Sequence, residues 1–146
     1  MSAPYRSKLD VWTVTVQLPA NASAFSNNVA TIQYADQFGQ VTSTTKLQLP
    51  YGFKIKDVVF ASAPSPDVVV IVDKNNGARQ WQSVPASQLV LQAGRPRLDP
   101  FGRDALNRKV VPAYNKFDIL TVIVRPLSNV GSSNVTVTFQ LYIEYT

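Results

Sequence analysis

Two carboxylates lie close together in a stretch that shows no strand periodicity. Asp99 and Asp104 bracket a turn at 100–103, within the irregular residues 93–109. A pair of carboxylates can act as general acid and base, or can bind a hard cation such as Ca²⁺. The spacing matches no calcium-binding loop, and each aspartate has an arginine within two positions. These aspartates are therefore expected to form surface ion pairs, which are common and weakly specific.

The same segment is rich in cations. Residues 93–109 hold five basic residues, two prolines and two glycines. Long irregular loops in compact domains are often functional. A nucleic-acid site needs basic and aromatic residues on one surface, but here the two aspartates dilute the positive charge. A loop of mixed charge fits a subunit contact better, because complementary charges fix the register of an interface. The candidate subunit contacts are Arg95, Arg97, Asp99, Phe101, Arg103, Asp104 and Arg108.

Trp81 is the other candidate contact residue. It lies among Arg79, Gln80 and Gln82, just after an Asn-Gly turn. An exposed aromatic ring surrounded by amides and a guanidinium could stack on a sugar ring or anchor a protein interface. The alternative is a partly buried tryptophan on an edge strand. The sequence leaves both interpretations open.

Composition argues against catalysis by the usual routes. The chain has no histidine and no cysteine, so it lacks the commonest general base, the thiolate nucleophile and the usual ligands of transition metals. It also contains no glycine-rich phosphate loop, no GxSxG sequence and no zinc-binding pattern. We therefore expect no enzyme activity, no catalytic residues, no cofactor, no bound metal and no small-molecule substrate.

Alternation of apolar and polar residues predicts strands along most of the chain. The clearest are 9–18 and 135–145, where apolar side chains occupy every second position. The run VVVIV at 68–72 indicates a central strand that is covered on both faces. Asn75-Asn76-Gly77 predicts a hairpin turn, because Asn-Gly accepts positive φ angles. The other expected strands are 29–34, 44–49, 53–61, 79–83, 88–92 and 117–125.

This pattern predicts the fold class. Eight or nine short strands joined by irregular segments indicate an all-β sandwich. A long final strand with the pattern of a central strand favours jelly-roll (Greek-key) wiring, and an immunoglobulin-like sandwich is the alternative. The prediction is a single-domain jelly-roll sandwich of about eight strands over residues 1–146, with a short N-terminal arm at 1–8. Its expected core contains Trp12, Val14, Val16, Val70, Ile119, Val122, Phe139, Leu141 and Ile143.

The closing strands provide a resemblance to a known family. Strands 117–125 and 135–145 are joined by a Pro/Ser/Asn/Gly link, in a chain rich in Ser, Thr, Asn and Gln and free of cysteine. In these features the chain resembles the single jelly-roll capsid proteins of icosahedral viruses. The resemblance implies a virion structural protein, either a capsid shell subunit or a vertex or spike component. Such a protein acts by self-assembly into a homo-oligomer and by contact with other virion proteins.

The net charge and the first residues of the chain indicate which partners and which location to expect. The net charge of +5 permits contact with anionic lipid heads or with a genome. Only Arg6 and Lys8 are basic in the arm, so contacts to subunits or lipid heads are favoured over genome binding. No apolar signal segment follows Met1, which is expected of a virion protein made in the host cytoplasm. The alternative function is a carbohydrate-binding or adhesion module, which usually belongs to a secreted protein.

Overall fold

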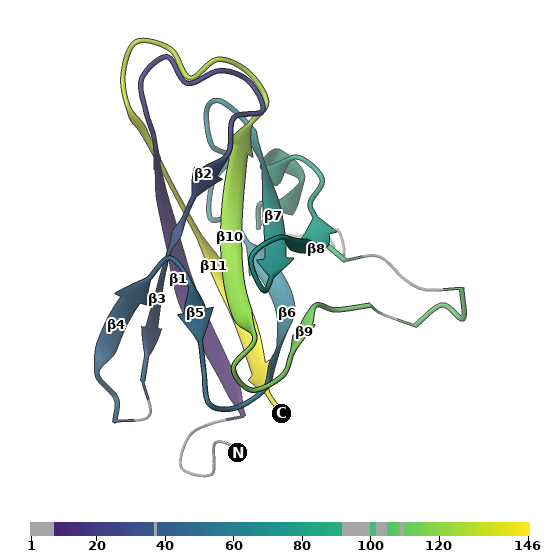
Figure 1. The fold of residues 1–146 in the computed structure, drawn as a ribbon. Coiled ribbons are helices and arrows are strands. Elements are labelled where there is room, and N and C mark those ends of the chain that lie inside the picture. Colours follow the sequence, from purple (N-terminus) through teal and green to yellow (C-terminus); the bar gives the residue numbers. More distant parts are fainter. Residues whose placement is uncertain (1–7, 37, 92–99, 102–104, 109) are drawn as a thin grey trace.

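The structure is a computed structural model that describes residues 8–36, 38–91, 100–101, 105–108 and 110–146. Half of these residues form two antiparallel sheets that pack face to face (Figure 1). Sheet A contains β1 (Leu9–Leu18), β3 (Thr31–Ala35), β4 (Val41–Thr44), β6 (Phe53–Val59), β9 (Ala113–Tyr114) and β11 (Val135–Tyr145). Sheet B contains β2 (Asn28–Val29), β5 (Leu47–Gln48), β7 (Val68–Lys74), β8 (Ala78–Gln82) and β10 (Ile119–Pro126).

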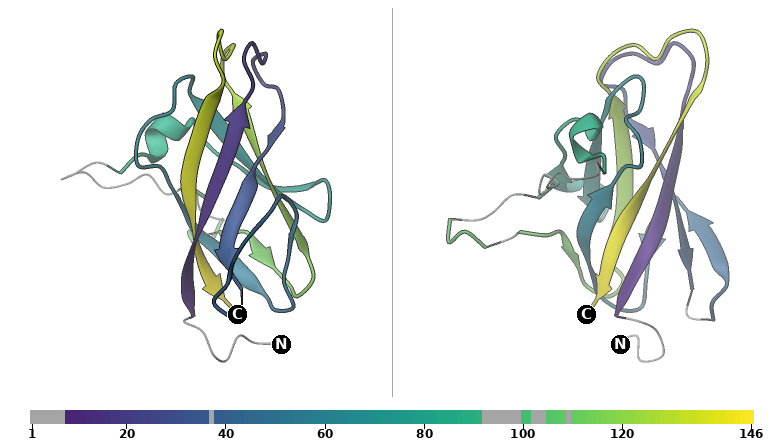
Figure 2. Two further views of the ribbon diagram at one scale, coloured as in Figure 1. Left: turned by 90° about the vertical axis from the view of Figure 1, so that its left-hand side faces the viewer. Right: turned by 180° about the vertical axis from the view of Figure 1, so that it is seen from behind.

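The order of the strands is that of a jelly roll. The first and last strands, β1 and β11, pair over ten residues in the middle of sheet A, and they run side by side in both views of Figure 2. The row β1-β11-β6-β9 of sheet A faces the row β2-β10-β7-β8 of sheet B. This is the double-sheet jelly-roll arrangement, and the hairpin β3–β4 widens sheet A beside β1. The predicted fold class is therefore confirmed.

The core lies between the two sheets, and strand alternation fills it. The even-numbered residues of β1 from Trp12 to Leu18 point inward, as do the odd-numbered residues of β11 from Val137 to Tyr145. All the residues expected in the core are buried except Ile119, which is only partly buried. The expectation for Ile119 was wrong because β10 turns its even-numbered residues, such as Leu120 and Val122, toward the core.

Two other features of the sequence have the predicted structure. All five residues of the VVVIV run in β7 are buried. The hairpin turn between β7 and β8 forms at Asn75, Asn76 and Gly77, whose φ angles of 54°, 64° and 142° are all positive. Asparagine and glycine tolerate such angles better than other residues do, so the local sequence suits this turn.

The short elements depart from the predicted strands. Of the strand expected at 88–92, the described residues 88–91 form none: a 3-10 helix, η1 (Ala86–Leu89), is followed by a single bridge between Val90 and Phe60. Ala86 and Leu89 are both buried, since their spacing places them on one side of this turn. The segments expected at 29–34 and 44–49 each divide between the sheets, and β9 was not expected.

The turn that precedes β10 is organised by the Asp118 carboxylate. Its Oδ2 accepts a hydrogen bond from the Asn115 backbone N–H at 2.8 Å, and its Oδ1 accepts one from Asn75 Nδ2 at 3.2 Å. The Asn75 side chain also accepts a hydrogen bond from the Ile119 backbone N–H. The bond from Asn115 is the largest cause of a lowered pKa at Asp118, followed by the bond from Asn75. The carboxylate thus connects the β7–β8 turn to the start of β10.

A lowered pKa makes the contribution of Asp118 to stability dependent on pH. Because the folded-state pKa lies below the unfolded-state value, the ionised carboxylate favours the folded state at neutral pH. This contribution is lost as the pH falls through the folded-state pKa. We expect the stability of the wild type to fall more steeply than that of Asp118→Asn between neutral pH and about pH 3. Urea denaturation across this range measures both slopes, and equal slopes would contradict the assignment.

Candidate interaction surfaces

Most of the predicted subunit contacts lie outside the described residues. Arg95, Arg97, Asp99, Arg103 and Asp104 belong to this group, so their role in a subunit contact stays a prediction. The two that are described differ in environment. Arg108 is exposed, whereas Phe101 is half-buried and packs against the core.

Trp81 makes its contacts within its own chain. Its ring centroid lies 4.7 Å from that of Phe101, with the ring planes tilted by 58°. Its Nε1 donates a hydrogen bond to the Pro100 carbonyl at 2.7 Å. Trp81 lies on the edge strand β8 and is half-buried against the core. Of the two interpretations, the structure agrees with a partly buried tryptophan on an edge strand. The contacts of Trp81 also hold residues 100–101 against the sandwich.

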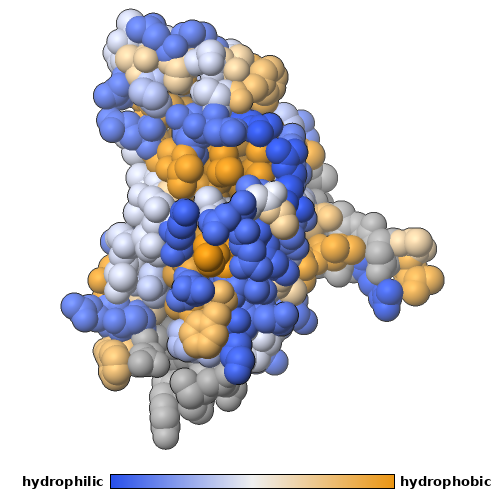
Figure 3. Space-filling view, viewed as in Figure 1, coloured by the Kyte–Doolittle hydropathy of each residue, from blue (hydrophilic) through white to orange (hydrophobic). Residues whose placement is uncertain are grey.

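The outer face of sheet B has an apolar area that the sequence did not single out. Val29, Ile123 and Ile71 are cross-strand neighbours in one row over β2, β10 and β7. Sheet B lies in front in Figure 1, and Figure 3 shows an apolar patch over these strands between hydrophilic bands. Val29 is 51% exposed, whereas Ile71 is covered by its neighbours and only 1% exposed. The accessible part of this row is therefore Val29 and the half-buried Ile123.

Two exposed phenylalanines flank β10. Phe25 donates its backbone N–H to the carbonyl of Pro126, the last residue of β10, and Phe117 precedes the first residue by two positions. Their side chains are 62% and 57% exposed. Both have φ angles in the left-handed region, 63° and 65°, which is rare for bulky residues. We call Phe25, Val29, Phe117 and Ile123 the β10 strip.

Charges of opposite sign lie on either side of the Ile123 row. Arg125 is two residues beyond Ile123, and its Nε donates a hydrogen bond to Asn27 Oδ1 at 2.6 Å. Thr121 is two residues before Ile123, directly opposite Asp73 on β7. Asp73 Oδ1 and Thr121 Oγ1 are buried and have no hydrogen-bond partner among the described residues. On the other side of Asp73, its cross-strand neighbour on β8 is Arg79. The face therefore has an apolar middle with Arg125 beyond one side and the Asp73–Arg79 pair of opposite charges beyond the other.

The outer face of sheet A differs in character. On the central strands it presents hydroxyl and amide groups, with Thr15 opposite Thr138 and Thr13 between Gln140 and Gln33. The uncharged polar side chains of this face are Thr13, Thr15, Gln17, Thr31, Gln33, Thr136, Thr138 and Gln140. The part around Thr13 and Thr15 is therefore suited to contact with water. The end of the same face near Leu9, Val11 and Tyr142 is apolar and exposed.

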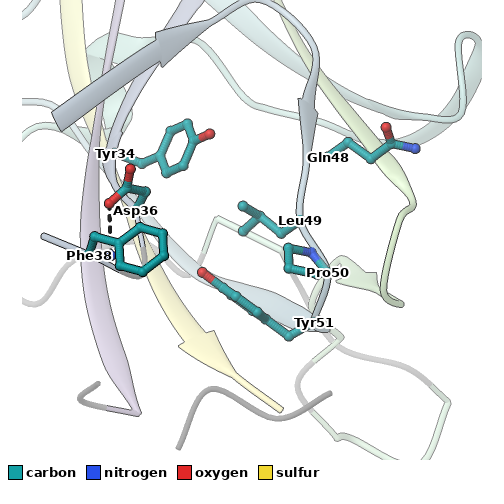
Figure 4. Close-up of a pocket in the computed structure, with 7 residues that line it drawn as sticks. All are labelled: Tyr34, Asp36, Phe38, Gln48, Leu49, Pro50 and Tyr51. Carbon is teal, nitrogen blue, oxygen red and sulfur yellow. Dashed lines mark hydrogen bonds between the residues drawn. The ribbon is translucent and has the colours of Figure 1, made fainter. Parts of the chain in front are cut away.

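A pocket opens between the β3–β4 turn and the segment that joins β5 to β6. Its volume is about 200 Å³, and we call it the aromatic pocket. Figure 4 shows the rings of Tyr34, Phe38 and Tyr51 around it, with the Asp36 carboxylate beside Tyr34 and Phe38. The lining residues are Tyr34, Asp36, Phe38, Gln48, Leu49, Pro50 and Tyr51.

Packing and hydrogen bonds hold the walls of the aromatic pocket in place. The Tyr34 ring lies 6.2 Å from the core residue Trp12, and the Tyr51 ring lies 5.3 Å from Tyr145 in an edge-on contact. Asp36 Oδ1 accepts hydrogen bonds from the backbone N–H groups of Phe38 and Gln40, both at 2.9 Å. No pattern in the sequence indicated that Asp36 and Phe38 would face residues 48–51.

The described residues provide neither a cluster of metal ligands nor a membrane-spanning helix. Among the described residues, no group of three or more acidic side chains is placed to hold a metal ion. Within the same part of the chain, no helix is long and apolar enough to cross a membrane.

The chain was compared with known proteins. No family model matches it, and no curated protein matches it.

Proposed function

We propose that this chain is a virion structural protein, a subunit of a capsid shell or of a vertex or spike, and that it acts by self-assembly. The β10 strip carries the proposal. Val29 and Ile123 are neighbours on the outer face of sheet B, and the exposed Phe25 and Phe117 lie near the two ends of β10. Exposed apolar side chains that lie close together are typical of protein contacts. Covering them with a second copy would remove apolar area from water, at about 25 cal/mol for each Å². The jelly-roll wiring supports the virion role, since this architecture is common in capsid proteins.

The charges around the β10 strip support contact between identical faces. Suppose that the outer faces of sheet B from two copies lie against each other, and that a twofold axis runs between them across the strands at the Ile123 row. The strands of the two copies then run in opposite directions. The Arg125 row of one copy then meets the row of Thr121 and Asp73 in the other. Opposite charges would meet twice in such an isologous interface, because each contact is repeated by the symmetry. In this arrangement Arg125 of each copy would lie near Asp73 of the other.

Further contacts belong to the same proposal. Residues 93–109 carry five basic residues and would contact other subunits, other virion proteins or anionic lipid heads. The carbohydrate-binding alternative has weaker support at Trp81, because the ring of this residue contacts Phe101 and its N–H is bonded to Pro100.

Self-association of the wild type tests the proposal. We expect the mass from light scattering to rise with protein concentration, and native mass spectrometry to show dimers or larger even-numbered assemblies. Electron microscopy of the concentrated protein would then show closed rings or shells. At about 1 mM, even a contact worth only about 4 kcal/mol would be half-formed. If the protein stays monomeric up to this concentration, self-assembly is ruled out as the function of the isolated chain.

A further inference from the structure

We propose that the aromatic pocket binds an organic cation, namely the guanidinium or alkylammonium group of an arginine or lysine side chain or of a free small molecule. This inference goes beyond self-assembly, because a single copy of the chain contains the whole site. Its volume of about 200 Å³ is enough for such a group and part of its alkyl stem.

The walls provide the surface that a cation prefers. Three aromatic side chains from separate segments, Tyr34, Phe38 and Tyr51, surround the space in Figure 4. The face of an aromatic ring attracts a cation through its quadrupole. Tyr34 and Tyr51 are held by Trp12 and Tyr145, so binding would not require these rings to be ordered. Leu49 and Pro50 complete an apolar wall against which an alkyl stem could pack.

The charge of the pocket is negative in a basic protein. Among the described residues that line it, Asp36 is the only charged one, whereas the chain as a whole carries +5. Both backbone hydrogen bonds to Asp36 reach Oδ1. Its Oδ2 has no hydrogen bond to a described residue, so this oxygen can accept one from a bound N–H group.

The polar groups of the lining do not suit an anion. The Gln48 amide, which could have donated into the pocket, donates instead to the Phe117 carbonyl at 2.8 Å and points away in Figure 4. An anionic group would meet the Asp36 carboxylate, and no described residue of the lining carries a positive charge to offset it. A neutral sugar could stack on the rings but would make no use of the charge, so the pocket favours a cation.

Binding can be measured by NMR titration of the full chain at a protein concentration low enough to keep it monomeric. The cationic probes are the N-acetyl methylamides of arginine and lysine, and the neutral probes are the same derivative of glutamine and a methyl glucoside. We expect saturable shifts of the Phe38, Gly39 and Gln40 amides with the cationic probes. The affinity should exceed that of either neutral probe by about fivefold or more.

Two variants separate the contributions of charge and ring. Asp36→Asn keeps an Oδ1 that accepts the two backbone bonds, so the turn is preserved while the charge is removed. We expect about fivefold weaker cation binding. Phe38→Leu removes a ring that is 83% exposed, which spares the core, and should weaken binding about threefold. The matched control is Tyr142→Leu, which removes an exposed ring on the outer face of sheet A and should leave binding unchanged.

The proposal is wrong if the cationic probes give no saturable shifts, if a neutral probe binds as tightly, or if Asp36→Asn binds cations like the wild type. A further titration identifies the source of the ligand. If a saturating arginine probe dissociates the self-associated protein, the natural occupant is a side chain of a neighbouring copy. If association persists while the probe is bound, the occupant is a free cation or another protein. The titration uses the monomer, so it tests cation binding even if the protein does not self-assemble.

Discussion

Replacing Phe139 with alanine is expected to lower the free energy of unfolding by about 3–5 kcal/mol, because the cavity left in a sandwich core cannot fully collapse. Phe139 lies in the middle of β11, opposite Val14 of β1, and is 2% exposed. Its ring stacks on that of Phe60 with centroids 4.7 Å apart and planes inclined by 21°. The substitution therefore removes buried apolar area from the core that the two sheets share. It also removes the ring contact between β11 and Phe60, the residue that follows β6.

Urea denaturation measures this effect, with Thr138→Ala as the matched control. Thr138 is the neighbour of Phe139 on the opposite, exposed face of β11, and its replacement should change stability by no more than about 0.5 kcal/mol. A loss below about 1 kcal/mol for Phe139→Ala would mean that the side chain does not fill the core as the structure places it.

Replacing Ile123 with lysine is expected to weaken self-association by at least about 30-fold. Ile123 lies at the centre of the β10 strip, and the proposed twofold axis would place it against its own copy. Two lysines brought together in a desolvated contact repel each other and lose the hydration of their charges. The unfolding free energy should change little, because Ile123 points away from the core. Analytical ultracentrifugation over a concentration series gives the dissociation constant.

A control and a charge exchange make this test specific. Thr15→Lys adds the same charge to the outer face of sheet A and should leave the dissociation constant unchanged. Asp73→Lys and Arg125→Glu should each weaken association, whereas the double variant should restore it, since the proposed symmetry pairs these two rows. If Ile123→Lys associates as the wild type does, the β10 strip is not the interface and residues 93–109 become the first surface to examine.

Much of the fold could be predicted from the sequence because alternation is a local property. The bounds of β1 and β11 agree with the expected strands 9–18 and 135–145. The five buried residues of β7 and the Asn75–Gly77 turn followed from residue type alone. In each case a short window of side chains carries enough information, because strand periodicity and turn geometry act over a few residues.

The short elements could not be predicted because their structure depends on distant partners. β9 has only two residues, and these form a strand by pairing with Phe53 and Lys54 of β6. The expected strand at 29–34 divides at Ala30, whose N–H bonds to Val122 of sheet B before the chain continues into sheet A. Two residues carry no useful alternation, so no pattern in the sequence could mark them.

For the interaction surfaces, the sequence by itself determined the types of residue and the side of each strand to which they point. It indicated that Thr and Gln alternate with a buried row in β1 and β11, and that a basic segment lies at 93–109. It also determined that histidine and cysteine chemistry is absent from this protein. These properties depend on composition and local periodicity, which do not change with the arrangement of the sheets.

Only the tertiary structure decided which side chains lie together and which remain uncovered. The aromatic pocket joins residues 34–38 to 48–51, and the β10 strip joins residues more than ninety positions apart in the chain, such as Val29 and Ile123. Trp81 could have been an open platform, but the ring of Phe101 lies against it. Exposure is set by what packs above a side chain, and in a jelly roll that neighbour usually comes from a distant strand or loop, beyond the reach of any local pattern.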